Sequence, residues 1–158
     1  METLEAAARA AAKAGAKALE QAGIAPADVD LIIVATVTPD MAFPATACLV
    51  QDRIGASRAW AYDLSAACSG FVYAHTVADS LVKAGVASRV LVLGAEKFSY
   101  ILDWTDRSTC VLFGDGAGAI VVEPSLAQTF YGQLKPISDN WVPAAIQVSG
   151  FSRRQTLE

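Results

Sequence analysis

Cys68 is the residue of this 158-residue chain best placed to act as a nucleophile. It lies in the segment DLSAACSGFVYA, where a predicted strand passes through three small residues into a predicted helix that starts at Cys68. The thiol would then lie at a helix N-terminus and at the carboxyl edge of a sheet, where α/β folds bind ligands. Unpaired N–H groups and the helix dipole favour thiolate over thiol at that position.

The small neighbours of Cys68 suit covalent chemistry. They leave room for an acyl carbonyl, and the backbone N–H of Cys68 could hold its oxygen as negative charge develops there. The same surroundings also suit a buried structural cysteine, because free cysteine is common in protein cores. On these residues alone, Cys68 is either an acyl-accepting thiol or a structural cysteine.

Other motifs carry weaker chemistry. His75 is the only histidine and lies two helical turns beyond Cys68, about 10 Å away. That separation is too long for proton transfer, so a hydrolase using this Cys–His pair would need a broken helix. The FGDGAGA segment precedes the strand-like AIVVE rather than a helix, which indicates turn glycines and not a phosphate loop. The cysteines and His75 lack metal-ligand spacing, so we expect no metal.

Composition excludes several classes of protein. Hydrophobic residues make up 54% of the chain, which suits a sheet buried on both faces or a chain that hides surface in an oligomer. A formal charge of −4 without a basic stripe argues against nucleic acid as a ligand. The Ala-rich start carries charges throughout, and the other apolar runs are too short for a membrane span. Three cysteines cannot all be bridged, so we expect a reduced, cytoplasmic protein.

Helix and strand patterns alternate at crossover spacing, which predicts a layered α/β/α fold with a mostly parallel sheet. The predicted helices cover Glu2–Gln21 with Gly23 as C-cap, a short segment ending near Ile54, and Ser69–Val82 ended by Gly85. The predicted strands cover Leu31–Val37, Ala59–Leu64 and Val90–Gly94, followed by an antiparallel hairpin of Thr109–Phe113 and Ala117–Glu123 around GDGAG.

The chain divides into two parts by composition. Residues 1–125 carry the regular pattern and Cys68, and we expect them to form one domain. Residues 126–158 contain proline and glycine with weak periodicity, which predicts an irregular tail with a short strand near Ala144–Val148. This tail could complete an edge of the sheet.

Several motifs taken together resemble the amino-terminal half of β-ketoacyl-acyl carrier protein synthase III. The motifs are VATVTPDMAFPATACLVQ, DLSAACSGFVYA, LGAEKFS, DWTDR and VLFGDGAGAIVVEPS, and the resemblance is collinear from about Glu2 to Ser125. It implies a thiolase-like half fold. The family joins an acyl-CoA starter to malonyl-carrier protein with loss of carbon dioxide, and Cys68 matches its acyl-accepting nucleophile.

The resemblance also implies roles for other residues and partners. Phe113 matches a position that lines the acyl pocket, and Phe43 matches one that reaches towards the partner subunit's pocket in the family dimer. Arg107 matches a basic residue near the nucleotide end of CoA, although an ion pair with Asp103 or Asp106 would explain it equally well. The implied partners are acyl-CoA as substrate, an acyl carrier protein and a second copy of the chain, with no bound cofactor.

The departures from the family bear on activity. Family members are much longer, and their second half supplies a His and an Asn that support decarboxylation. The only such residues here are His75 and Asn140, which lies in the unmatched tail. We therefore expect self-acylation of Cys68 without full condensation. The alternative is a non-catalytic fragment, truncated or engineered, that self-associates.

The tail segment SDNWVPAAIQVSGFSRRQTLE faintly resembles the family segment that precedes the first helix. In the family a tryptophan of that segment stacks on the adenine of CoA, so Trp141 would be the stacking residue. Ala145 would replace a basic residue. This interpretation places the tail at the sheet edge beside Leu31–Val37.

Overall fold

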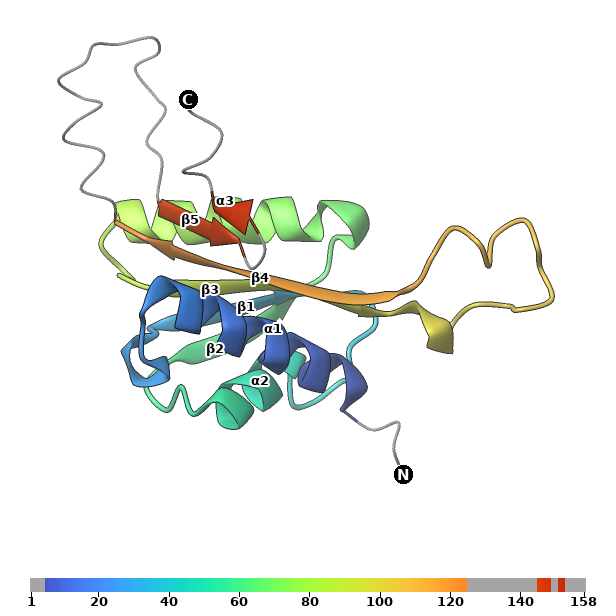
Figure 1. Cartoon of the computed structure of the whole chain (residues 1–158), viewed down its shortest axis with the longest axis horizontal. Coiled ribbons are helices and arrows are strands. Elements are labelled where there is room, and N and C mark those ends of the chain that lie inside the picture. The colour runs from blue at the N-terminus through green and yellow to red at the C-terminus, as the bar shows by residue number, and fades with distance from the viewer. Residues whose placement is uncertain (1–4, 125–144, 149–150, 153–158) are drawn as a thin grey trace, which may run out of the picture.

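A computed structural model describes residues 5–124, 145–148 and 151–152. Its strands form one six-stranded sheet with the order β2-β1-β3-β4-β5-β6 and helices on both faces (Figure 1). The strands are β1 Leu31–Ala35, β2 Trp60–Leu64, β3 Val90–Lys97, β4 Asp115–Glu123, β5 Ala145–Val148 and β6 Phe151–Ser152. The helices are α1 Ala6–Ala22, α2 Thr46–Ile54 and α3 Gly70–Lys83, and there are short 3-10 turns at Pro26–Asp28, Ala67–Ser69 and Phe98–Tyr100.

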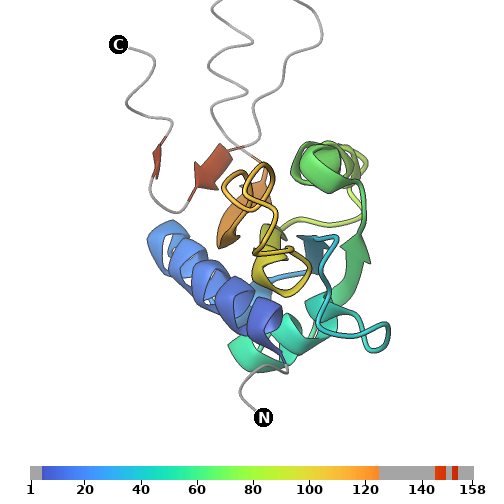
Figure 2. The same ribbon diagram turned by 90° about the vertical axis from the view of Figure 1, so that its right-hand side faces the viewer.

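The predicted layered α/β fold is confirmed. Strands β2, β1 and β3 are parallel, and β4 runs antiparallel to β3. Helix α3 covers one face of the sheet, and α1 and α2 cover the other (Figure 2). Gly23 is the C-cap of α1 with φ 69°, and Gly85 follows α3 with φ 70°, as expected of glycines at helix ends.

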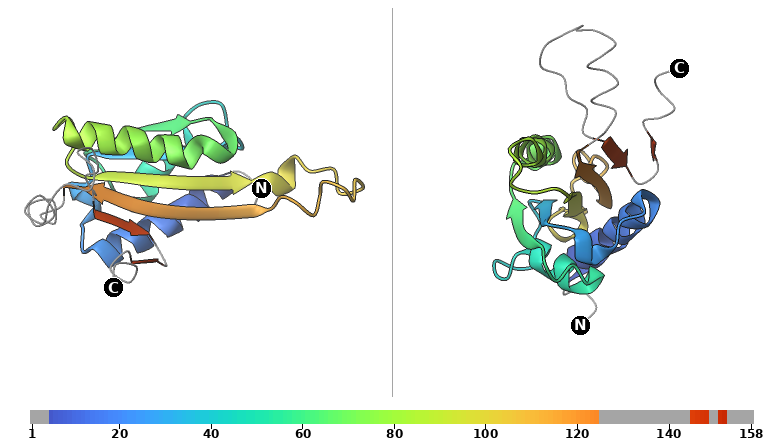
Figure 3. Two further views of the ribbon diagram at one scale, coloured as in Figure 1. Left: turned by 90° about the horizontal axis from the view of Figure 1, so that it is seen from above. Right: turned by 90° about the vertical axis from the view of Figure 1, so that its left-hand side faces the viewer.

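The predicted hairpin within residues 109–123 is wrong. Residues 109–113 form turns, and the glycines of GDGAG belong to the extended strand β4, which starts at Asp115. The antiparallel partner of β4 is β3, with paired residues from Val90↔Val122 to Lys97↔Asp115. The connection between β3 and β4 extends beyond the other strands (Figure 3). The error arose because glycines usually indicate turns, whereas these lie on a strand face that carries no side chains.

The tail contributes strands but not at the expected place. Strand β5 corresponds closely to the strand predicted near Ala144–Val148, and it pairs antiparallel with β4. The neighbours of β1 are β2 and β3. The interpretation that places the tail beside Leu31–Val37 is therefore wrong in its position, and Trp141 lies outside the described residues.

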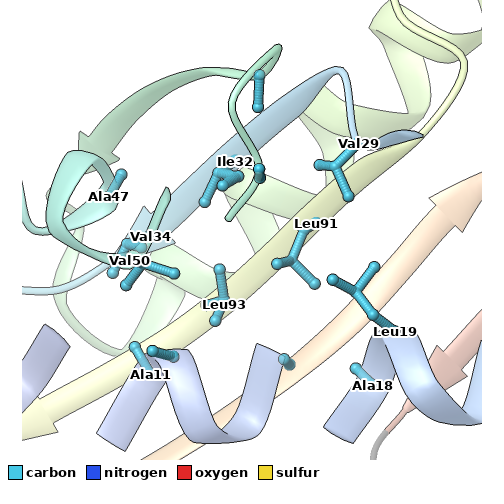
Figure 4. Close-up of a cluster of buried hydrophobic side chains, with 14 of the residues drawn as sticks. Ala11, Ala18, Leu19, Val29, Ile32, Val34, Ala47, Val50, Leu91 and Leu93 are labelled. Atoms are coloured by element: carbon cyan, nitrogen blue, oxygen red, sulfur yellow. The ribbon is translucent and has the colours of Figure 1, made fainter. Parts of the chain in front are cut away.

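The core consists of two apolar layers separated by the sheet. All five residues of β1 are buried, as its unbroken apolar pattern indicates. The side chains of β3 alternate between layers: Leu91 and Leu93 face α1 and α2 (Figure 4), whereas Val90 and Val92 face α3. A Cβ on Gly15 of α1 would lie only 3.1 Å from Leu91 and 3.3 Å from Leu93, so a glycine lets this helix approach β3 closely.

Two aspartates from distant segments cap the helices on the α1–α2 face. Neither α1 nor α2 has a capping side chain at its own N-cap residue. Asp40 instead accepts hydrogen bonds from the backbone N–H groups of Ala7 and Ala8 at 2.9 and 2.7 Å. Asp63, on β2, accepts from those of Thr46 and Ala47, both at 2.8 Å. The carboxylates satisfy N–H groups that a helix leaves unpaired and oppose its positive end.

Asp63→Ala should lower the free energy of unfolding by about 1 to 2 kcal/mol, because it removes both acceptors from the start of α2. Urea denaturation would measure the loss. Asp79→Ala is the matched control, since Asp79 only forms a surface pair with Lys83 four residues on and should cost less than about 0.5 kcal/mol. Equal losses for the two variants would contradict the capping role.

Candidate active site

Cys68 lies in a tight turn between β2 and α3. The prediction that the helix starts at Cys68 is wrong by two residues: Ala67–Ser69 form a 3-10 turn, and α3 begins at Gly70. Ala67 has φ 47°, a left-handed conformation that residues other than glycine rarely adopt. Such conformations occur preferentially at functional sites, where the surrounding structure imposes them. The turn holds Cys68 immediately before the helix, with its side chain exposed.

The backbone around Cys68 leaves a donor available. Ser69 donates its N–H to the carbonyl of Ala66, and Gly70 donates to that of Ala67. Among the described residues, no acceptor is present for the N–H of Cys68. This N–H lies next to the thiol and at the positive end of α3, so it is suited to bind an oxyanion formed by attack of the thiol.

A pocket of about 250 Å³ opens beside Cys68. It is formed where β1, β3 and β4 end or begin and where the Cys68 turn meets α3. Its lining is almost entirely small or apolar, with Glu96 as the only ionisable side chain besides Cys68. The lining residues are Ala35, Val37, Ala67, Cys68, Phe71, Gly94, Ala95, Glu96, Phe98, Gly116, Ala117 and Gly118.

Glu96 fixes one wall of this pocket. Its carboxylate accepts hydrogen bonds from the N–H of Val37 at 3.0 Å and from the N–H and hydroxyl of Thr38 at 3.2 and 2.5 Å. The hydroxyl of Thr36 donates to it at 3.3 Å. Thr38 Oγ1 also accepts from the N–H of Lys97 at 2.7 Å. The carboxylate thereby ties the segment after β1 to the end of β3.

Phe113 does not line the pocket but contacts a residue that does. Its ring stacks on Phe98, with centroids 5.1 Å apart and an interplanar angle of 16°, and Phe98 lines the pocket. Phe113 itself is 45% exposed. Phe43 is 87% exposed and does not line the pocket. Of the predicted site residues that fall within the described ranges, Cys68 alone lines the pocket directly.

Arg107 is exposed on the connection between β3 and β4. Within the described residues it forms no ion pair with Asp103 or Asp106, so the alternative explanation of this arginine is not supported. Asp103 instead accepts from the hydroxyl and N–H of Thr105. The hydroxyls of Ser108 and Thr109 lower the pKa of Asp106 to about 2.

His75 does not line the pocket. It is half-buried on α3, and its Nε2 is buried without a hydrogen-bond partner among the described residues. Sequence reasoning overlooked Phe71, Gly94, Glu96 and Phe98 as pocket residues. The signal was available in part, because Phe71 follows Cys68 by one turn of helix and LGAEKFS lies at the carboxyl end of a predicted strand.

Comparison with known proteins defines the class. The structure is similar to that of 3-oxoacyl-[acyl-carrier-protein] synthase III from Aquifex aeolicus, with a TM-score of 0.73 and 57% identity over 75% of this chain and 38% of that one. The structure is also similar to that of the priming β-ketosynthase of the R1128 polyketide pathway, with a TM-score of 0.71 and 43% identity over 73% of this chain and 34% of that one. The fold is therefore that of the thiolase-like condensing enzymes.

Sequence comparison specifies the family. The profile of 3-oxoacyl-[acyl-carrier-protein (ACP)] synthase III matches residues 62–137. The chain is 58% identical to a β-ketoacyl-[acyl-carrier-protein] synthase III of Chelativorans sp. over 91% of this chain and 43% of that protein. The β-ketoacyl-[acyl-carrier-protein] synthase III of Sinorhizobium medicae is 63% identical over 75% of this chain and 35% of that protein. The chain is thus similar to part of β-ketoacyl-ACP synthase III, and it spans about two fifths of the length of these relatives.

Proposed function

We propose that this chain is the nucleophile-bearing part of a β-ketoacyl-ACP synthase III, in which Cys68 accepts an acyl group from acyl-CoA. The observation that carries the proposal is the exposed thiol of Cys68, which lies before the N-terminus of α3 and lines a mainly apolar pocket. No helix in the described ranges is long and apolar enough to cross a membrane. All three cysteines are free thiols, which suits a cytoplasmic enzyme.

Acyl transfer follows from this geometry. The thiolate sulfur of Cys68 attacks the thioester carbonyl, and a new carbon–sulfur bond forms. The N–H of Cys68 stabilises the resulting oxyanion, which forms at the positive end of α3. The carbonyl then re-forms, the bond to CoA breaks, and the CoA thiolate takes up the proton that Cys68 released. The chain supplies the nucleophile and one oxyanion donor for this half-reaction, and the family resemblance assigns a second oxyanion donor to the other half of the enzyme.

The second half-reaction, condensation with malonyl-ACP, needs support that this chain does not offer. The family resemblance assigns decarboxylation to a His and an Asn of the second half, whereas His75 is the only histidine and does not line the pocket. We therefore expect acylation of Cys68 but no condensation by this chain alone. The names of the relatives support an acyl carrier protein as partner.

We assign the remaining predicted residues by the same resemblance. Phe113, stacked on Phe98, would bound the acyl group. Arg107, exposed and without a carboxylate partner among the described residues, would contact CoA phosphates, and Trp141 would stack on its adenine. Phe43 would reach a second subunit. Exposed apolar side chains on the β3–β4 connection support a homodimer: Tyr100, Ile101, Trp104, Val111, Leu112 and Phe113.

Incubation with acetyl-CoA followed by intact-mass measurement tests the proposal. We expect one acetyl adduct on the wild-type chain, none on Cys68→Ser, and an unchanged adduct on the matched control Cys110→Ser. Absence of the adduct from the wild type, or its persistence on Cys68→Ser, would support the alternative of a non-catalytic, self-associating module. Gel filtration of the same samples would report the oligomeric state.

A further inference from the structure

The pocket lies next to the apolar core beneath α3, where the residues of β3 and β4 that face α3 change from large apolar side chains to glycines. On β3 the residues facing α3 are Val90 and Val92 and then Gly94, and on β4 they are Val122 and Ile120 and then Gly118 and Gly116. Gly94 pairs with Gly118, and Glu96 pairs with Gly116. Strands disfavour glycine, and an interior glycine often marks the close approach of a ligand or of another backbone.

The paired glycines have different surroundings. A Cβ on Gly94 would lie 3.3 Å from Cδ2 of Phe71, so the Phe71 ring already covers this position. A Cβ on Gly118 would have no heavy atom within 4 Å. Both glycines and Phe71 line the same pocket as Cys68. Phe71 therefore closes the pocket over β3, while Gly118 leaves it open over β4.

We propose that Phe71 and Gly118 set the size of the acyl group that Cys68 can carry. This inference rests on the proposed acyl transfer and adds its specificity: an apolar chain that extends from Cys68 along β4, across Gly118 and past the edge of the Phe71 ring. The chemistry of the lining supports an apolar chain, since the carboxylate of Glu96 is engaged by the segment after β1.

Substitutions of the two residues should change the size of the pocket in opposite directions, so one pair of variants tests the proposal. Gly118→Val adds a branched side chain to the open wall, and β-branched residues suit a strand, so the fold should persist. Phe71→Ala removes the ring that closes the other wall. Gly114→Val is the matched control for the first, since a Cβ there also meets nothing within 4 Å but Gly114 does not line the pocket. Tyr73→Ala, on the exposed side of α3, is the control for the second.

Alkylation of Cys68 by N-methylmaleimide and N-hexylmaleimide, followed by mass spectrometry of the Cys68 peptide, measures pocket size without acyl transfer. We expect Gly118→Val to lower the hexyl-to-methyl rate ratio about tenfold and Phe71→Ala to raise it about threefold, because each methylene in an apolar pocket changes affinity by a comparable factor. The ratio should stay unchanged in Gly114→Val and Tyr73→Ala. Gly118→Ala, a gentler change, should lower it less than Gly118→Val.

Equal ratios in all variants, or equal slowing of both reagents by Gly118→Val, would overturn the assignment. The second result would mean that Gly118 accommodates another part of the backbone rather than a ligand. Acetyl-CoA and octanoyl-CoA then separate the two proposals. If the maleimide pattern holds but neither thioester acylates Cys68, acyl transfer is wrong while the size rule stands. If acylation proceeds with no change in chain preference, the size rule is wrong.

Discussion

Glu96→Ala should slow acylation of Cys68 by about 100-fold, because it releases the segment after β1 and a displacement of about 1 Å at a reacting group costs this much. The change leaves the N–H groups of Val37 and Thr38 and the hydroxyl of Thr38 without their acceptor. We therefore also expect the free energy of unfolding to fall by about 2 kcal/mol, the cost of unpaired, partly buried polar groups. Rapid-quench mass spectrometry with acetyl-CoA and urea denaturation would measure the two effects.

Two variants control for this prediction. Glu96→Gln keeps one carbonyl acceptor and should give intermediate values for both measurements. Glu123→Ala removes a carboxylate from the other end of β4, where it pairs with Arg89 near the surface, and should leave the acylation rate unchanged. An acylation rate of Glu96→Ala equal to that of the wild type would show that the wall does not position the reacting groups.

Gly15→Leu should lower the free energy of unfolding by about 3 kcal/mol. Helix α1 passes so close to β3 that even a Cβ on Gly15 would crowd Leu91 and Leu93, and overpacking of this kind strains a core. The better helix propensity of leucine, worth about 1 kcal/mol over glycine, offsets only part of the strain. Thermal and urea denaturation would both show the loss.

Ala16→Leu is the matched control for Gly15→Leu. Ala16 is the next residue on α1 and is exposed, so the same leucine should change stability by less than about 0.5 kcal/mol. Should both variants retain wild-type stability, α1 must be able to move away from β3 without cost, and the close approach at Gly15 would not be needed for the fold.

Much of the fold could be predicted from local patterns. The unbroken apolar run of β1 indicated a strand buried on both faces, and the small residues before Cys68 indicated a sharp strand-to-helix connection. Both readings depend on neighbours in sequence. The helix start was misplaced by two residues because a 3-10 turn with Ala67 in a left-handed conformation has no distinct sequence signal.

The pocket was harder to predict because its contacts are distant in sequence. Glu96 bonds to residues 58 to 60 positions away, and no local pattern distinguishes it from an ordinary charged residue after a strand. The glycines of β4 indicated a turn, because glycine is uncommon in strands. A strand face without side chains is explained only by the pocket that lies over it, and the sequence does not show that pocket. Phe71 has the pattern of a core residue of α3 and also packs against that core.

The place of β4 in the sheet determines when the thiol acquires its surroundings. Cys68 and the segment after β1 are made early during vectorial synthesis, whereas Gly116 and Gly118 lie in β4, the last of the three strands that line the pocket. A nascent chain on the ribosome would present Cys68 in an open groove until β4 emerges and pairs with β3. The reactivity of this one thiol should therefore report when β4 pairs with β3, and selectivity among alkylating reagents should appear only after that pairing.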